Sequence, residues 1–169
     1  MASWKAAVVV LGAMLLAPLV ALAEGTAEFK VWAMEAHTEG RDTPHFDPGL
    51  DEVKDAVKSL NFDTYLKLKT DEHTFSDKQE YRAAINDQYT LTASAPTVAK
   101  DGRYRMKIKI TMPSEKNPDD EIDALATELL LQPGKKVLVR GLKLGEGKEM
   151  VVVLSLAAPE SKAVDKPQK

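Results

Sequence analysis

Residues 150–156 read MVVVLSL, and the five apolar residues from Met150 to Leu154 decide the fold class. Three successive valines favour a β-strand, because β-branched side chains pack well on a pleated surface. Successive residues of a strand point to opposite faces of the sheet. An unbroken apolar run therefore predicts a strand that is central in its sheet or covered on both faces.

A second β-signal lies in residues 103–112, RYRMKIKITM, where basic and apolar side chains alternate strictly. This period of two predicts a strand with one face toward the core and the other toward water. Residues 62–69, FDTYLKLK, end on the same alternation. The two strands together carry six basic side chains: Lys67, Lys69, Arg103, Arg105, Lys107 and Lys109. If the strands are neighbours, like charges would face one another and would need acidic partners or an anionic ligand.

The six basic residues have two interpretations. As a solvated face they need no function, because alternation is what any strand with one wet face requires. As a binding face they would give a mildly acidic domain a local field opposite to its net charge of −3. Such a face would steer polyanions or acidic protein surfaces, and its binding would weaken with salt. We take the six residues as the candidate binding face.

One amphipathic helix is predicted over residues 50–60. Apolar residues recur there at steps of three and four, at Leu50, Val53, Val57 and Leu60. Asp47 and Pro48 precede the helix, and they suit an N-cap and a first helical residue.

Short strands are also predicted at residues 28–36, 73–75, 81–85, 89–93 and 136–140, between turns rich in Gly, Pro and Asp. Residues 122–131 fit a helix by the spacing of their apolar residues and a strand by the alternation of LATELLL. We favour the strand, because Pro133 and Gly134 suit the centre of a type II turn back to a partner strand.

These elements predict an α+β domain, with one short amphipathic helix packed on a mostly antiparallel sheet of about seven or eight strands. The predicted core consists of Leu50, Val53, Val57, Leu60, Leu66, Leu68, Met106, Ile108, Ile110, Val151, Val153 and Leu154.

The N-terminal segment has the pattern of an export signal. Lys5 precedes an apolar run from Ala6 to Val20, and small residues end at Ala23, where a signal peptidase would cleave. An uncleaved anchor is the alternative, but the run is shorter than the roughly 20 residues that span a bilayer. We expect a signal peptide at residues 1–23, a single domain at 24–157 and a disordered tail at 158–169, which is polar and aperiodic.

Composition limits the function classes. The chain has no cysteine, which excludes disulfides, thiol catalysis and a lipid-modified N-terminal cysteine. Its acidic balance is untypical of proteins that bind nucleic acid, which carry strong basic charge. We therefore expect an exported, soluble protein in the periplasm or outside the cell, with no stable membrane insertion after cleavage.

His37, His45 and Asp47 form the best metal candidate, because imidazole and carboxylate groups suit a divalent ion such as zinc. The alternative is a solvated loop in which Asp47 only caps the helix. If the metal site exists, it would make the protein a metal-dependent hydrolase.

Other catalytic patterns are absent from the sequence. There is no G-x-S-x-G nucleophile elbow, and the glycines of LKLGEGKEM do not form a phosphate-binding loop. The acidic residues at 119–123 suit an exposed loop. We therefore predict a non-enzymatic accessory or structural module without a cofactor, which binds an exported protein or an anionic envelope component through its surface.

The exported leader, FDTYLKLK and the closing stretch LLLQPGKKVLVRGLKLGEGKEMVVVLSL together resemble a group of uncharacterised periplasmic proteins of bacteria. The resemblance covers most of the chain beyond the leader and includes no catalytic motif. It implies no function, but it favours a strand over a helix at residues 125–131.

Overall fold

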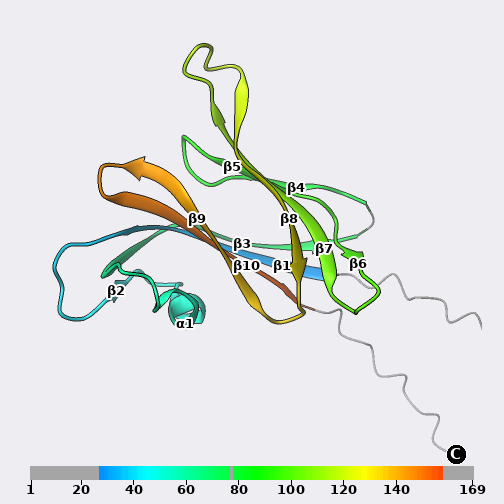
Figure 1. Cartoon of the computed structure of the whole chain (residues 1–169), viewed down its shortest axis with the longest axis horizontal. Helices are drawn as coiled ribbons and strands as arrows, with labels where there is room; N and C mark the ends of the chain where they lie inside the picture. The colour runs from blue at the N-terminus through cyan, green and yellow to red at the C-terminus, as the bar shows by residue number, and fades with distance from the viewer. Residues whose placement is uncertain (1–26, 77, 158–169) are drawn as a thin grey trace, which may run out of the picture.

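The computed structural model describes residues 27–76 and 78–157, which form ten strands in two five-stranded sheets (Figure 1). The strands are β1 (Ala27–His37), β2 (His45–Phe46), β3 (Thr64–Phe75), β4 (Tyr81–Ala84), β5 (Thr90–Ala93), β6 (Thr97–Val98), β7 (Tyr104–Pro113), β8 (Glu121–Leu131), β9 (Lys136–Gly145) and β10 (Lys148–Ala157). A single short helical segment follows β2, with a 3-10 turn η1 (Asp51–Val53) and a helix α1 (Lys54–Val57). The protein is therefore mostly β.

The first sheet has the strand order β2-β3-β1-β10-β9. β1 pairs antiparallel with both β10 and β3, and only β2 joins in parallel. Phe29, Val31 and Ala33 of β1 point into one buried cluster, while Trp32 and Met34 point into another. The strand predicted at residues 28–36 therefore has both of its faces buried.

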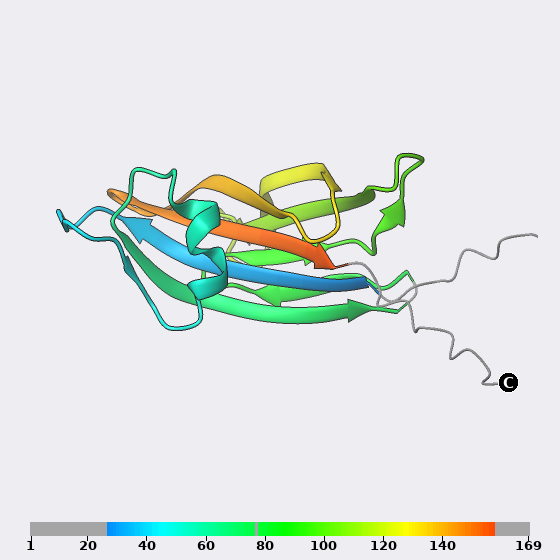
Figure 2. The same ribbon diagram turned by 90° about the horizontal axis from the view of Figure 1, so that it is seen from below.

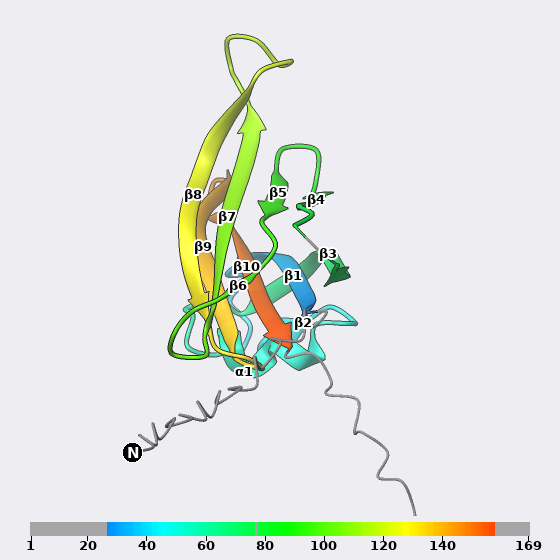
Figure 3. The same cartoon turned by 90° about the vertical axis from the view of Figure 1, so that its right-hand side faces the viewer.

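The second sheet has the order β4-β5-β7-β6, and β8 pairs with the other side of β7. Its inner face packs on the first sheet, so that the two sheets form a sandwich (Figure 2). Met106, Ile108 and Ile110 supply the inner side of β7. Figure 3 shows that the hairpin of β7 and β8 extends beyond the other strands of its sheet.

Two apolar clusters hold the layers together. The larger lies between the sheets, and β10 contributes Met150, Val152 and Leu154 to it. The smaller lies between the first sheet and the helical segment, and it receives Val151 and Val153 from the same strand. The prediction that the valine run is covered on both faces is confirmed.

The predicted single sheet of seven or eight strands is wrong. An alternating pattern such as that of β7 requires an apolar layer against its inner face, but it does not say whether a helix or a second sheet supplies the layer. Here the second sheet supplies it. The antiparallel character and the single short helix are confirmed, and β2 and β6, with two residues each, escaped prediction because they are too short to show a period.

The helical segment is shorter than predicted and covers only residues 51–57. Leu50, Val53 and Val57 are fully buried as expected, while Leu60 is only partly buried. Asp47 does not cap the helix. Instead its carboxylate Oδ2 accepts the Lys67 N–H at 2.8 Å, because β2 pairs with β3 and Asp47 continues that ladder.

The strand interpretation of residues 122–131 is confirmed by β8. Pro133 and Gly134 occupy the centre of a tight turn, in which the Lys135 N–H donates to the Gln132 carbonyl at 3.0 Å and Gly134 has φ = 72°. This geometry is that of a type II turn. The turn does not join paired strands, however, because β8 belongs to the second sheet and β9 to the first.

Most of the predicted core is buried, but Leu66 and Leu68 are only partly so. No helix within residues 27–76 and 78–157 is long and apolar enough to cross a membrane. The predicted signal peptide lies outside the described residues, as does the predicted tail at 158–169.

Candidate functional site

The six candidate basic residues do not form one face. Lys67 and Lys69 lie on β3 of the first sheet, where the neighbouring strands are β1 and β2. Arg105, Lys107 and Lys109 lie on β7 of the second sheet, and Arg103 immediately precedes that strand. The alternation of β7 was read correctly, but alternation carries no information about which strands become neighbours.

The two lysines of β3 are also separated from each other. The register of β3 shifts against β1, so that Met34 pairs with Lys67 and the adjacent Ala33 pairs with Lys69. Directly paired residues share a face of the sheet. Lys67 therefore lies on the helix side with Met34, and Lys69 lies on the inter-sheet side with Ala33. The Lys69 ammonium is 3.8 Å from the Asp71 carboxylate.

The basic residues of β7 meet acidic partners on β8. Lys109 Nζ lies 2.8 Å from Asp123 Oδ1, and Arg105 Nε lies 3.3 Å from Glu128 Oε1. Lys107 is paired in register with the same Glu128. The basic residues of β7 therefore face acidic residues on the neighbouring strand, and not the lysines of β3. Charges of both signs share this surface, which we call the outer charged face: Arg82, Arg105, Lys107, Lys109, Asp123 and Glu128.

An apolar patch adjoins one end of the outer charged face. Leu130 is paired with Arg105 and is 41% exposed, and Val98 of β6 is 61% exposed. Both residues line a shallow hollow of about 440 Å³, together with Arg103 and Arg105. Exposed apolar patches rimmed by polar groups mark protein-contact sites when they are large, and Val98 and Leu130 form a small one.

The predicted metal residues lie on two different strands. His37 ends β1 and His45 begins β2, and β3 runs between them, with Thr64 paired to both. The Nε2 atom of His37 is 3.0 Å from a Glu39 carboxylate oxygen, whereas His45 Nε2 is 3.5 Å from Asp47 Oδ1. Within the described part of the chain, no group of three or more His, Cys, Asp or Glu side chains could hold a metal ion. The hydrolase alternative stays a prediction, which metal analysis of the purified protein would test.

Asp63 organises the loop between β1 and β2, although no sequence pattern distinguishes it from other aspartates. Its carboxylate accepts backbone N–H groups from Glu39, Gly40 and Arg41 at 2.8 to 2.9 Å, and the Thr64 hydroxyl at 2.8 Å. These donors stabilise the charged form, with the N–H of Glu39 as the largest contribution, and lower the pKa of Asp63 to about 2. Through these hydrogen bonds Asp63 holds residues 39–41 next to the start of β3.

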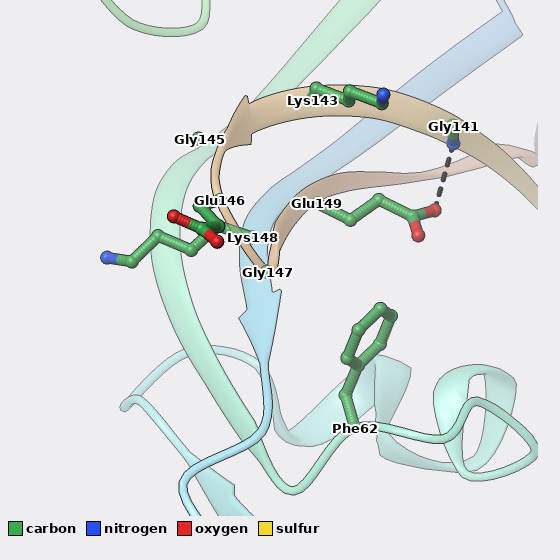
Figure 4. A pocket seen from close by; sticks show the side chains of 8 residues that line it. All are labelled: Phe62, Gly141, Lys143, Gly145, Glu146, Gly147, Lys148 and Glu149. Carbon is green, nitrogen blue, oxygen red and sulfur yellow. Dashed lines mark hydrogen bonds between the residues drawn. The ribbon is translucent and has the colours of Figure 1, made fainter.

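A second hollow, of about 500 Å³, lies between Phe62 and the hairpin of β9 and β10 (Figure 4). The Phe62 ring points toward the hairpin, where the Glu149 carboxylate accepts the Gly141 N–H at 2.9 Å. Lys148, which also lines the hollow, forms an ion pair with Glu35, with 2.7 Å between Nζ and Oε1. Of the charged residues that line the hollow, Glu149 is bound by Arg140 and Lys148 by Glu35.

Comparisons of the chain with protein-family models, with curated proteins and with solved structures find no match. The resemblance to periplasmic proteins therefore stays a prediction, and the functional argument depends on the geometry of the surface.

Proposed function

We propose that the protein is an exported accessory module that binds another protein through the outer charged face, without catalysing a reaction. The observation that carries this proposal is that none of the described helices or strands covers the outer face of the second sheet. The corresponding face of the first sheet is buried under the helical segment, where Leu50, Val53 and Val57 pack on it.

The charge pattern favours a protein over an anionic envelope polymer. A polyanion is attracted by a patch of one sign, whereas Arg105 and Lys109 are already paired with Glu128 and Asp123. Alternating charges beside the exposed Leu130 and Val98 suit a partner with a complementary mixed surface. Such a surface contributes specificity and association rate more than affinity.

Export is part of the proposal and depends on the leader. The apolar run from Ala6 to Val20 and the small residues before Glu24 support cleavage after Ala23 and a periplasmic or secreted location. Mass spectrometry of the protein from its native host should find Glu24 at the N-terminus. An intact leader in the membrane fraction would instead show an anchored protein.

The binding proposal is tested by crosslinking and pull-down from the cell-envelope fraction. The double variant Arg105→Glu, Lys107→Glu reverses two charges on the outer charged face and should lose the partner that the wild type recovers. The control is Lys67→Glu, which makes the same kind of change on the first sheet and should leave recovery intact. If all three proteins recover the same partners, the outer charged face is only a solvated surface.

A further inference from the structure

β8 is an open edge of the second sheet. It is 11 residues long, and among the described residues it pairs with β7 alone. The single register shift against β7 lies between Ile110 and Thr111, so residues 125–131 form a regular strand. A regular edge strand presents a row of unpaired N–H and C=O groups, which can pair with another strand.

The residues of this edge do not protect it from pairing. Residues 124–131 read ALATELLL and contain no lysine, arginine, proline or glycine. β9, at an edge of the first sheet, is different. It carries Lys136, Arg140 and Lys143 in exposed positions, and its pairing with β10 is interrupted at Arg140 and Gly141. Charged side chains and bulges are the devices that block edge-to-edge pairing, and the regular part of β8 carries only one charged residue, Glu128.

The inner side of β8 also leaves apolar surface incompletely buried. Leu125 and Leu129 pack against the core between the sheets but are only partly buried, and so are Val137 and Leu144 of β9. No pairing joins β8 to β9. A strand added beside β8 would place its inward side chains next to Leu125 and Leu129 and remove more of their surface from water.

We propose that a second copy of this chain binds at the β8 edge, with the two β8 strands antiparallel about a two-fold axis at Thr127. In this register Leu125 faces Leu129 of the other copy on the inner side. Ala126 faces Glu128 of the other copy, so the acidic residue of the regular part does not lie opposite another acidic residue. A register centred on Glu128 would instead oppose two glutamates, which is destabilising.

A second copy suits this edge better than a disordered peptide. Its β8 is already an ordered strand held by β7, so pairing requires little further loss of conformational entropy. Two identical edges related by a two-fold axis also pair with each other completely, so that neither β8 edge remains open. The dimer would merge the two second sheets into one sheet of ten strands and present two outer charged faces.

The main test uses the absence of cysteine from the chain. In Thr127→Cys the two cysteines would face each other across the axis, where directly opposed residues have Cβ atoms about 5 Å apart, close to disulfide geometry. Mild oxidation at micromolar concentration should give a disulfide-linked dimer on a non-reducing gel. The matched control, Lys143→Cys on the β9 edge, should stay a monomer. Equal crosslinking at the two positions would overturn the proposal.

The oligomeric state supplies the second test. Light scattering of the wild-type protein at micromolar concentration should give twice the monomer mass. A monomer mass at that concentration would overturn the inference. Ala126→Glu places a glutamate opposite Glu128 twice per dimer and should raise the dissociation constant by about tenfold. Within its own chain the new glutamate lies beside Lys109, its partner on β7, which favours folding. Ala126→Lys, which faces Glu128 with an opposite charge, should not weaken the dimer.

Discussion

The two sheets bury their interior strands in different ways. β10 of the first sheet has apolar residues on both faces. One face packs on the second sheet and the other packs on the helical segment. β7 of the second sheet buries Met106, Ile108 and Ile110 and leaves its basic residues in water. The difference follows from the connections, because residues 38–63 between β1 and β3 form a covering layer and the second sheet has no helix over it among the described residues.

The comparison shows where this protein can interact. A strand with an unbroken apolar run must pack against other elements on both faces, so its outer face is not accessible to another protein. A strand with alternating residues is satisfied by one layer, and its polar side remains available. The following predictions measure how much stability each face contributes.

The largest expected effect is on the covered outer face of the first sheet. Trp32 is 3% exposed and packs in the cluster beneath the helical segment. Trp32→Ala should lower the free energy of unfolding by about 3–5 kcal/mol, because a large cavity replaces the indole ring. Urea unfolding monitored by circular dichroism measures the change. A loss below about 1 kcal/mol would mean that the helical segment does not cover this face in solution.

The next prediction compares the loss of unfolding free energy at a buried position and at an exposed position of β7. Ile108→Ala should cost about 2–5 kcal/mol, since the side chain is buried between the sheets. Lys107→Ala, at the adjacent exposed position, should change stability by no more than about 0.5 kcal/mol. Denaturant curves of both variants test the assignment directly, and similar losses would show that the faces of β7 were assigned wrongly.

The smallest expected effect concerns Asp63, whose carboxylate binds residues 39–41 of the covering layer. The pKa of Asp63 is lowered to about 2, so its charged form stabilises the folded state at every pH above its unfolded value of about 3.9. That contribution is lost as the pH falls through about 2. The stability advantage of the wild type over Asp63→Asn should therefore be constant at neutral pH and shrink between about pH 4 and pH 2. An advantage independent of pH would contradict a role for the charge.

The sequence predicted the elements of this fold better than their assembly. The valine run and the alternation in RYRMKIKITM identified a doubly covered strand and a one-sided strand, because side-chain direction in a strand follows directly from position. Whether Lys67 lies near Lys107 depends on the order of strands in the sheets, which alternation does not encode. Asp63 escaped notice because its partners are backbone N–H groups of a loop, and these leave no residue-type signature.

The path of the chain also has a consequence for the order of folding. β4 to β8 follow one another in sequence and complete the second sheet with short connections, whereas the first sheet pairs Glu28 with Ala157. Pairing such distant segments costs conformational entropy, because a long loop must close before β1 and β10 can contact each other. We expect amides of β7 and β8 to gain protection before those of β10 in pulse-labelled hydrogen exchange, and the reverse order would refute this. During synthesis the first sheet lacks one of its interior strands until β10, the last of the described strands, has left the ribosome.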